Sequence, residues 1–256
     1  MNAPAVKDVI ARLTERIPDP LFYQLLARQF RWQEPELRCL STFVPPDAPA
    51  IDVGAWWGPW TYWLSRQVPH VVAFEPQPRA AAFLDRVTGK NVTVRAEALS
   101  DASGPAVLRL SGRRRGKDAL ATLECNGAPE SETITVPTCR LDDLDVEAVG
   151  FIKIDAEGHE SAVLRGGQEL IRRCSPVLFV EIEQRHIGHP IERSFAEIAD
   201  LGYRGYFLWR GRWLPVDELD VEVHQASPDI RGHEYVNNFL FAPERAGDLH
   251  ERLLQT

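Results

Sequence analysis

The sequence AIDVGAWWGPW at residues 50–60 decides the fold. An apolar strand is followed by an acidic residue and two glycines, and a helix then opens at Pro59. A second apolar strand, residues 71–74, ends in Glu75, which lies twenty-one residues after Gly54. This order of strand, glycine turn, helix, strand and acid is typical of a nucleoside site. Glycines let backbone approach the ligand, and the acid accepts hydrogen bonds from ribose hydroxyls.

The glycine spacing indicates which nucleoside is bound. A dinucleotide site has the pattern G-x-G-x-x-G, which leaves a bare helix N-terminus facing a pyrophosphate. Here three residues separate Gly54 from Gly58, the third glycine is absent, and Asp52 precedes the turn. A carboxylate at that point suits a ligand that carries an ammonium and a sulfonium. The pattern favours S-adenosylmethionine over NAD, with a purely structural turn as the alternative.

Composition and charge narrow the class of protein. The 256 residues are 44% hydrophobic, which suits one large α/β domain with a substantial core. The net charge of −8 argues against a broad nucleic-acid-binding face, because phosphate binding relies on clustered cations. The four cysteines are widely spaced and form no C-x-x-C motif, so neither a zinc site nor a disulfide framework is expected.

The sequence gives no sign of export or of a membrane span. Lys7 and Asp8 fall within what would be the apolar core of a signal peptide. No apolar run approaches the roughly eighteen residues that are needed to cross a bilayer. We therefore expect a cytoplasmic protein.

Apolar runs alternate with helical patterns along most of the chain. Strands are expected at 50–54, 71–74, 92–99, 151–155, 176–183, 203–209 and 237–242, with helices at 59–67, 78–87, 160–170 and 191–201. Continuous apolar runs such as VLFV predict a mostly parallel sheet that is covered on both faces. Two extra strands, 106–110 and 133–138, flank the long polar loop 111–132, and Arg210-Gly211 predicts a tight turn.

The first part of the chain is helical rather than stranded. Residues 3–44 have apolar positions at helical spacing, and a proline-rich segment, 45–49, closes them. This part is too short to bury a core of its own. We therefore predict an N-terminal helical cap over residues 1–49 and a cofactor-binding domain over residues 50–256. The apolar cap helices also offer a surface for a homodimer.

Acidic residues lie at the carboxyl ends of most of the predicted strands. They are Asp52, Glu75, Glu97, Asp155, Glu157, Glu181 and Glu183. In doubly wound sheets, ligands bind beyond these strand ends, at the point where the strand order reverses. A single such carboxylate is commonly a helix cap. Several of them on one edge predict a binding site.

Two histidines fall close to the same edge. His159 and His186 are candidates for a general base, and each could instead be structural. Together with the nearby carboxylates they form a possible set of ligands for a divalent cation. Linear spacing does not show that these groups converge, so we expect no metal site and keep the cation as an alternative.

Aromatic and basic clusters flank the predicted site. The aromatic cluster comprises Trp56, Trp57, Trp60, Tyr62 and Trp63. We expect core packing for most of these rings, with one or two stacked on adenine or walling the acceptor pocket. The basic run 113–117 in the long loop is either a solvated segment or a clamp for an anionic substrate.

With these segments in hand, the chain resembles the FkbM family of S-adenosylmethionine-dependent methyltransferases from about Trp32 to Pro243. The resemblance rests on IDVGAWWGPWT, VVAFEPQP, VTVRAEALSD, VPTCRLDDL, and IKIDAEGHESAVLRGG followed by VLFVEIEQRH. It implies a class I methyltransferase (Rossmann-like) fold: a seven-stranded, mostly parallel sheet with its last strand antiparallel and helices on both faces. It also implies methyl transfer to a hydroxyl oxygen of a sugar, polyketide or related secondary metabolite.

The resemblance assigns the methionine and ribose contacts by matching motifs. Asp52, Gly54 and Gly58 would line the methionine part of the cofactor. Glu75 would hold the ribose hydroxyls. One position departs from the family pattern D-V-G-A-N-x-G, because Trp56 stands where asparagine is expected. An indole cannot reproduce the donor and acceptor of an amide, although backbone contacts from the turn could survive.

The resemblance also assigns the adenine end and the reacting centre. Glu97, Ala98 and Leu99 would border adenine, with Glu97 accepting from the exocyclic amine. Asp155 would lie beside the methionine end or the reacting centre. An alcohol is a weak nucleophile, so a base that takes its proton speeds the reaction. The candidates are His159, His186 and Asp155.

Three other functions stay open. An NAD(P)-dependent oxidoreductase is disfavoured by the missing glycines and by the lack of an S-x-x-x-Y-x-x-x-K pattern. A methyltransferase that acts on RNA or protein is disfavoured by the acidic balance and by the lack of an N-P-P-Y motif. A non-catalytic binding protein on the same fold is supported by Trp56. The sequence does not identify the acceptor.

Overall fold

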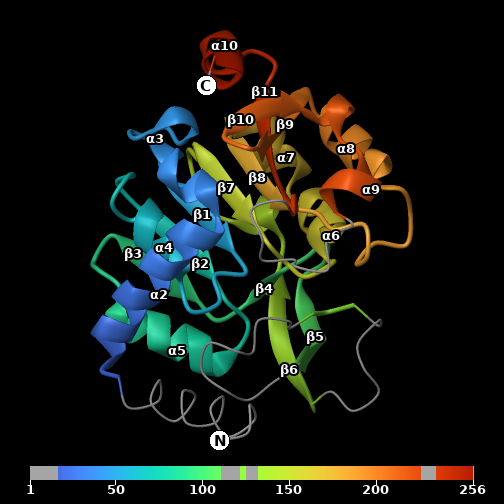
Figure 1. The fold of residues 1–256 in the computed structure, drawn as a ribbon. Coiled ribbons are helices and arrows are strands. Elements are labelled where there is room, and N and C mark those ends of the chain that lie inside the picture. The colour runs from blue at the N-terminus through green and yellow to red at the C-terminus, as the bar shows by residue number, and fades with distance from the viewer. Residues whose placement is uncertain (1–16, 111–121, 125–131, 226–234, 256) are drawn as a thin grey trace, which may run out of the picture.

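The computed structural model describes residues 17–110, 122–124, 132–225 and 235–255. Within them, the main sheet has eight strands in the order β10-β9-β11-β8-β7-β1-β2-β3. The strands are β1 (Ala50–Val53), β2 (Val71–Phe74), β3 (Val92–Arg95), β7 (Phe151–Ile154), β8 (Val177–Glu181), β9 (Tyr203–Trp209), β10 (Arg212–Pro215) and β11 (Asn238–Pro243). The predicted helical layers are present on both faces (Figure 1).

The strand order reverses at the centre of this sheet. β1 pairs in parallel with β2 on one side and with β7 on the other. β2 continues to β3, and β7 continues to β8, also in parallel. Beyond β8 lies β11, which is antiparallel to both β8 and β9. The crevice at the carboxyl ends of β1 and β7 is therefore the place where a doubly wound sheet binds its ligand.

The prediction of seven strands in the main sheet is wrong by one. The eighth strand, β10, turns back from β9 and pairs with it over four residues. Arg210 and Gly211 make the expected tight turn, with φ angles of 50° and 82°. The second arm is thus long enough to extend the edge of the sheet.

The prediction of one strand over 92–99 is also wrong. The strand stops at Arg95, and the chain leaves the main sheet to form β4 (Ala98–Leu99). β4 pairs with β6 (Glu132–Cys139), which pairs with β5 (Gly104–Leu110) in a separate three-stranded sheet at one end of the main sheet (Figure 1). β5 and β6 confirm the two extra strands. The change of sheet leaves Glu97 at the corner between them.

Helices cover the two faces of the main sheet. On one side lie α2 (Asp19–Gln33), η1 (Pro35–Arg38), α3 (Leu40–Phe43), α4 (Pro59–Leu64), α5 (Pro78–Val87) and α10 (Gly247–Gln255). On the other lie α6 (Glu160–Arg165), α7 (Gln168–Cys174) and α8 (Ile191–Ala199), with α9 (Val221–His224) beside them. Short 3-10 turns are η2 (Leu141–Asp143) and η3 (Val216–Glu218). Among the described residues, no helix has the length and apolarity for a membrane span.

The predicted helix over 160–170 is divided into α6 and α7. Its interruption contains Gly166 and Gly167. A Cβ added at Gly166 would lie 2.0 Å from the carbonyl oxygen of Ser100. The close approach of these two backbones requires glycine and breaks the helix there.

The N-terminal helices pack on the sheet side that carries the glycine turn. Phe22 and Tyr23 of α2 contact Trp57, Tyr62 and Phe83 edge to face. Together they form one buried apolar cluster. The cap boundary at residue 49 stays a prediction, and the part of the cap before residue 17 lies outside the described residues.

Candidate active site

A cavity of about 760 Å³ lies at the carboxyl ends of β1, β2, β7 and β8. α2, η1 and the residue between them contribute one wall through Phe22, Leu26, Phe30, Glu34 and Glu36. The strand ends contribute most of the predicted site residues: Asp52, Gly54, Glu75, Glu97, Ala98, Leu99, Asp155, Glu157, His159, Glu181 and Glu183. The structure thus brings residues from both the cap and the sheet to one hollow.

The turn after β1 is built on two glycines with positive φ. Gly54 has a φ of 72°, and a Cβ added there would lie 1.8 Å from the carbonyl oxygen of Asp155. Gly58 has a φ of 80°, and a Cβ there would crowd Leu84 and Tyr23. Gly54 lines the cavity, whereas the demand for glycine at Gly58 comes from helix packing. A contact between Gly58 and the methionine part of a cofactor stays a prediction.

Trp56 occupies a backbone conformation that suits asparagine. Its φ is 50°, in the left-handed region where asparagine is several-fold enriched among non-glycine residues. The backbone N–H of Trp56 donates to Oε2 of Glu75 at 2.7 Å, and the indole packs against Phe30. The turn thus places an indole at a position whose backbone conformation favours asparagine.

Glu75 is held in place by backbone groups on both sides. Trp56 N–H donates to Oε2, and Gln77 N–H donates to Oε1, each at 2.7 Å. The carboxylate is buried and also lines the cavity. Each carboxylate oxygen can accept more than one hydrogen bond. Glu75 is thus an acceptor whose orientation is fixed by the backbone.

Asp52 is a buried carboxylate with one unsatisfied oxygen. Thr61 Oγ1 donates to its Oδ2 at 2.5 Å, while Oδ1 is buried without a hydrogen-bond partner. Burial raises the pKa of Asp52, and the nearby Lys153 lowers it in part. Buried polar atoms are nearly always hydrogen-bonded in proteins. The free oxygen therefore marks a place for a ligand donor.

The predicted adenine end lies where the chain changes sheets. Glu97 is ion-paired with Arg95 at 2.5 Å, and Ala98 and Leu99 begin the small sheet. All three predicted residues line the cavity, together with Leu108 and Leu123. This end is mainly apolar, with one carboxylate at its rim.

Lys153 is a central residue that the sequence interpretation missed. It lies on β7 directly opposite Asp52 on β1, and its Nζ donates to Asp155 Oδ2 at 2.9 Å. Burial lowers the pKa of Lys153, but Asp155, Glu181, Glu34 and Asp52 together raise it above its ordinary value. The lysine is therefore a fixed cation. Its signal in the sequence was a charge inside the apolar run FIKI.

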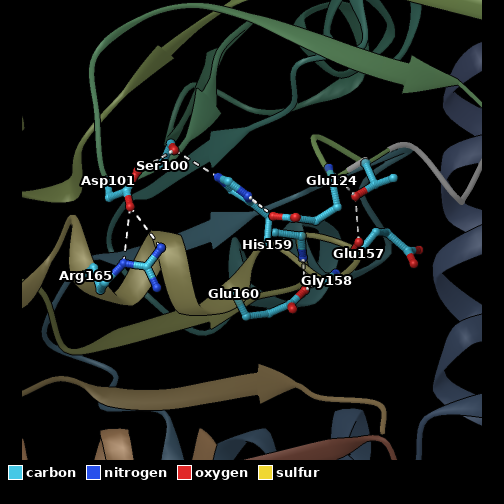
Figure 2. A network of polar contacts seen from close by, with 10 residues as sticks. Ser100, Asp101, Glu124, Glu157, Gly158, His159, Glu160 and Arg165 are labelled. Atoms are coloured by element: carbon cyan, nitrogen blue, oxygen red, sulfur yellow. Dashed lines mark hydrogen bonds and ion pairs between the residues drawn. The ribbon is translucent and has the colours of Figure 1, made fainter. Parts of the chain in front are cut away.

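His159 connects two segments of the chain by hydrogen bonds, as Figure 2 shows. Its Nδ1 lies 2.7 Å from Glu124 Oε1, and its Nε2 lies 2.9 Å from Ser100 Oγ. An ionised carboxylate only accepts, so Nδ1 donates to Glu124, while Nε2 is engaged with the Ser100 hydroxyl. His159 lines the cavity, but both of its nitrogens are engaged.

The same network fixes the start of α6. Arg165 donates to Oδ2 of Asp101 through Nε and Nη2, beside Ser100 (Figure 2). Glu160 accepts from the N–H groups of Ala156 and Gly158. Thr122 Oγ1 donates to the carbonyl of Glu157 at 2.7 Å. Sequence reasoning found His159 but missed its partners, because Ser100 and Glu124 are far from it in the chain.

A row of carboxylates forms the far wall of the cavity. Glu157 has a φ of 50°, and burial, then Asp155, raises its pKa to about 9. Glu181 accepts from Asn237 Nδ2 at 2.7 Å, and burial raises its pKa well above the ordinary value. Glu183 accepts from Tyr235 at 2.6 Å and pairs with Arg185. Among the described residues, no three of the metal-ligating types are arranged to hold an ion.

His186 lies behind this wall. Its Nδ1 is 3.8 Å from Glu157 Oε2, and burial lowers its pKa. It is not among the described residues that line the cavity. To act as a base, it would have to reach the acceptor through Glu157 or a rearranged loop.

The cap contributes two acids that no sequence signal indicated. Glu34 Oε2 accepts from Trp60 Nε1 at 2.6 Å, and burial raises the pKa of Glu34 to about 7. Burial also raises the pKa of Glu36 to about 8, and its Oε2 has no hydrogen-bond partner. Trp60 is buried, in line with core packing, and it also lines the cavity. The basic run 113–117 lies outside the described residues.

Comparison with known proteins identifies the family of the chain. The family model described as the methyltransferase FkbM domain matches residues 52–208. The chain therefore belongs to the FkbM methyltransferase family. The match covers the glycine turn, the second-strand acid and the carboxylate wall up to Glu183. No curated protein matches the chain.

One solved structure shows the same fold. The structure of methyltransferase FkbM from Methylobacillus flagellatus KT has a TM-score of 0.51 and 16% identity, and the match covers 93% of this chain and 60% of that one. This chain thus spans only 60% of that relative's length. A putative methyltransferase from Streptococcus mutans in complex with SAH matches at 13% identity and a TM-score of 0.43, over 81% of this chain and 95% of that one. The predicted class I methyltransferase fold is confirmed, apart from the number of strands.

Proposed function

We propose that this methyltransferase uses S-adenosylmethionine and methylates a hydroxyl oxygen of a small molecule, such as a sugar, a polyketide or a related secondary metabolite. The observation that carries the proposal is the unsatisfied oxygen of Asp52. Oδ1 is buried without a donor on the wall of a cavity that Gly54 and Glu75 also line. The ammonium group of the methionine moiety supplies such a donor.

The cofactor half of the cavity fits the rest of that ligand. Gly54, which lines the cavity, borders the methionine part, and Asp52 accepts from its ammonium group. Glu75, already oriented by two backbone N–H groups, accepts from the ribose hydroxyls. Glu97 faces the adenine end, where Leu99 provides an apolar surface. These residues would hold and orient the cofactor.

Methyl transfer needs alignment and a destination for one proton. When bound, S-adenosylmethionine supplies a methyl group on a sulfonium sulfur: the acceptor oxygen bonds to the methyl carbon, the sulfur keeps the electrons of the broken bond, and the hydroxyl proton leaves. Holding the acceptor in line contributes roughly 7–11 kcal/mol. A base that takes the proton adds about 10²–10⁴-fold.

Asp155 is the favoured base among the three predicted residues. Its carboxylate lines the cavity next to the glycine turn and is partly exposed to it. Lys153 donates to Oδ2, so Oδ1 is the oxygen that takes the proton from the acceptor hydroxyl. His159 has both nitrogens engaged, and His186 stands behind Glu157.

A calorimetric titration tests the cofactor assignment. S-adenosylmethionine, S-adenosylhomocysteine and NAD are titrated in parallel into the full-length protein. We expect micromolar binding of the two sulfur ligands and none of NAD. Binding of NAD alone would replace the proposal with an oxidoreductase. No binding of either sulfur ligand to folded protein would instead favour a non-catalytic protein on this fold.

A further inference from the structure

Among the residues that the structure describes, the half of the cavity that we propose for the acceptor carries more carboxyl groups than cations. Lys153 pairs with Asp155, and Arg185 pairs with Glu183. The wall contains three more carboxyl groups, those of Glu34, Glu157 and Glu181. Within the described part of the chain, no ion pair to a lysine or arginine is found for any of these three. Once the two cations are matched, three carboxyl groups of the described wall remain without a cation, and burial raises the pKa of each of them.

The buried wall atoms that have no hydrogen-bond partner also favour a ligand that donates hydrogen bonds. Among the wall residues that the structure describes, every buried side-chain atom without a hydrogen-bond partner is an oxygen: Glu36 Oε2, Asp52 Oδ1 and Asn238 Oδ1. Asn238 is 5% exposed and is not acidic. The amide oxygen therefore indicates a hydrogen-bond donor on the ligand, and this indication does not depend on the carboxyl groups. Buried acceptors require donors, and the ligand must bring them.

A carboxyl group without a cation and the unsatisfied amide oxygen lie together at the end of β8. Asn238 on β11 lies directly opposite Glu181 on β8. One Glu181 oxygen, Oε1, accepts from Asn237 Nδ2. Asp155 and Glu157 are close enough to raise the pKa of Glu181. Glu181 therefore lies between an unsatisfied amide oxygen and the favoured base.

The chemistry of the wall decides among ligand classes. An anionic group would find no unmatched cation among the described wall residues and would disfavour ionisation of these carboxyl groups further, whereas a cationic group would favour it. A neutral hydroxyl group would supply a donor but no charge. An ammonium group supplies three donors and a positive charge, and it satisfies carboxylates and an amide oxygen together. The ammonium group of the cofactor cannot do this, because the proposed function places it at Asp52 on the other side of Lys153.

On the basis of the proposed function, we infer that the hydroxyl acceptor also carries a protonated amine, which Glu181 and Glu157 bind beside Asp155. The amine anchors the acceptor at the wall, and the hydroxyl is presented toward the methyl group. Glu181 is a binding residue in this arrangement, separate from the base.

Matched pairs of small alcohols test the inference. The amines are glucosamine, trans-2-aminocyclohexanol and tyramine. Their neutral partners are glucose, trans-cyclohexane-1,2-diol and tyrosol, in each of which a hydroxyl replaces the amine. Each compound is titrated into full-length protein saturated with S-adenosylhomocysteine. We expect at least one amine to bind at least tenfold more tightly than its neutral partner.

The variant Glu181→Gln assigns the effect to the wall. Glutamine keeps the oxygen that accepts from Asn237 but has no charge. We expect it to weaken amine binding about tenfold and to leave S-adenosylhomocysteine binding unchanged. Glu251→Gln, at an exposed position in α10, is the matched control and should alter neither.

Each outcome separates this inference from the proposed function. If S-adenosylhomocysteine binds and no amine binds better than its neutral partner, the inference is overturned and the methyltransferase proposal stands. A preference for the amine that persists in Glu181→Gln would also overturn the assignment to this wall. Failure of S-adenosylhomocysteine to bind would refute the proposed function itself.

Discussion

The two halves of the cavity are built in different ways. In the half that we propose for the cofactor, Glu75 is fixed by two backbone N–H groups that lie within nineteen residues of it, and the turn depends on Gly54. In the half that we propose for the acceptor, Glu181 and Glu183 are held by the side chains of Asn237 and Tyr235, more than fifty residues away. The proposed cofactor half is therefore fixed by backbone groups that are close in sequence. The proposed acceptor half is fixed by side chains that are far apart in sequence.

The largest effect is expected from the cofactor turn. Gly54→Ala puts a Cβ 1.8 Å from the Asp155 carbonyl oxygen at a φ of 72°. We expect a loss of about 2–5 kcal/mol in the free energy of unfolding, measured by denaturant titration. Gly202→Ala is the control, because its φ is 86° but nothing lies within 4 Å. It should cost only about 1 kcal/mol. Equal losses would show that the close approach is unimportant.

The second largest effect is expected on turnover, and it distinguishes the proposed base from the two histidines. Asp155→Asn should lower turnover about 100-fold while the cofactor Kd changes less than threefold. His159→Asn and His186→Asn should each lower turnover less than tenfold. Methyl transfer from labelled S-adenosylmethionine to any accepted alcohol provides the rate. A larger fall for either histidine would move the proton transfer to that residue.

Replacing one oxygen of the Glu75 carboxylate by an NH₂ group tests the proposed contact with the ribose. In Glu75→Gln, one backbone N–H of the turn faces an amide NH₂ instead of an oxygen. We expect S-adenosylhomocysteine to bind about 10–30-fold more weakly by calorimetry. Glu97→Gln, at the partly exposed adenine end, should weaken binding less than threefold. The ranking of the two acids would be contradicted by the reverse order.

The free energy of unfolding should depend on pH through the Glu157 carboxyl group. Burial and the neighbouring Asp155, Glu160 and Glu183 raise the pKa of Glu157 to about 9, although Lys153 opposes them. The folded state therefore binds a proton that the unfolded state releases above about pH 4.5, so this contribution to stability is lost as pH rises toward 9. In Glu157→Gln that loss should disappear, and the variant should exceed the wild type by about 1 kcal/mol at pH 9. Equal slopes of unfolding free energy against pH would contradict this.

The smallest effect concerns the unusual tryptophan. Trp56→Asn restores a residue type that accepts the left-handed φ of 50°, but it removes the contact with Phe30. The two changes oppose each other, so we expect the free energy of unfolding to change by less than about 1 kcal/mol. Trp56→Val, whose branched side chain disfavours positive φ, should cost more in the same denaturation assay. If both variants behave alike, the backbone conformation is not the constraint.

The same contrast explains what could be predicted from the sequence. The glycine turn, Glu75 and the order of parallel strands follow from short segments with local patterns, and the structure places them as expected. The change of sheet after Arg95 was missed because it depends on pairing between Ala98 and Thr138. The roles of Glu34 and Glu36 were missed because only the packing of the cap turns two ordinary acids into buried ones.

Lys153 lies between these two cases. Its position in an apolar strand was visible in the sequence, but its role depends on four carboxylates from different parts of the chain. The partners of His159 show the same limit, since Ser100 and Glu124 come from separate segments (Figure 2). Sequence patterns thus identified the strand ends, and the structure identified which side chains meet there.

The most direct test of the account is a crystal structure of the protein with S-adenosylhomocysteine. We predict that the ribose hydroxyls lie within hydrogen-bond distance of Glu75 and that the amino group of the ligand donates to Asp52 Oδ1. The account would be contradicted if the ligand bound elsewhere, or if it bound at the glycine turn and left Asp52 Oδ1 without a donor.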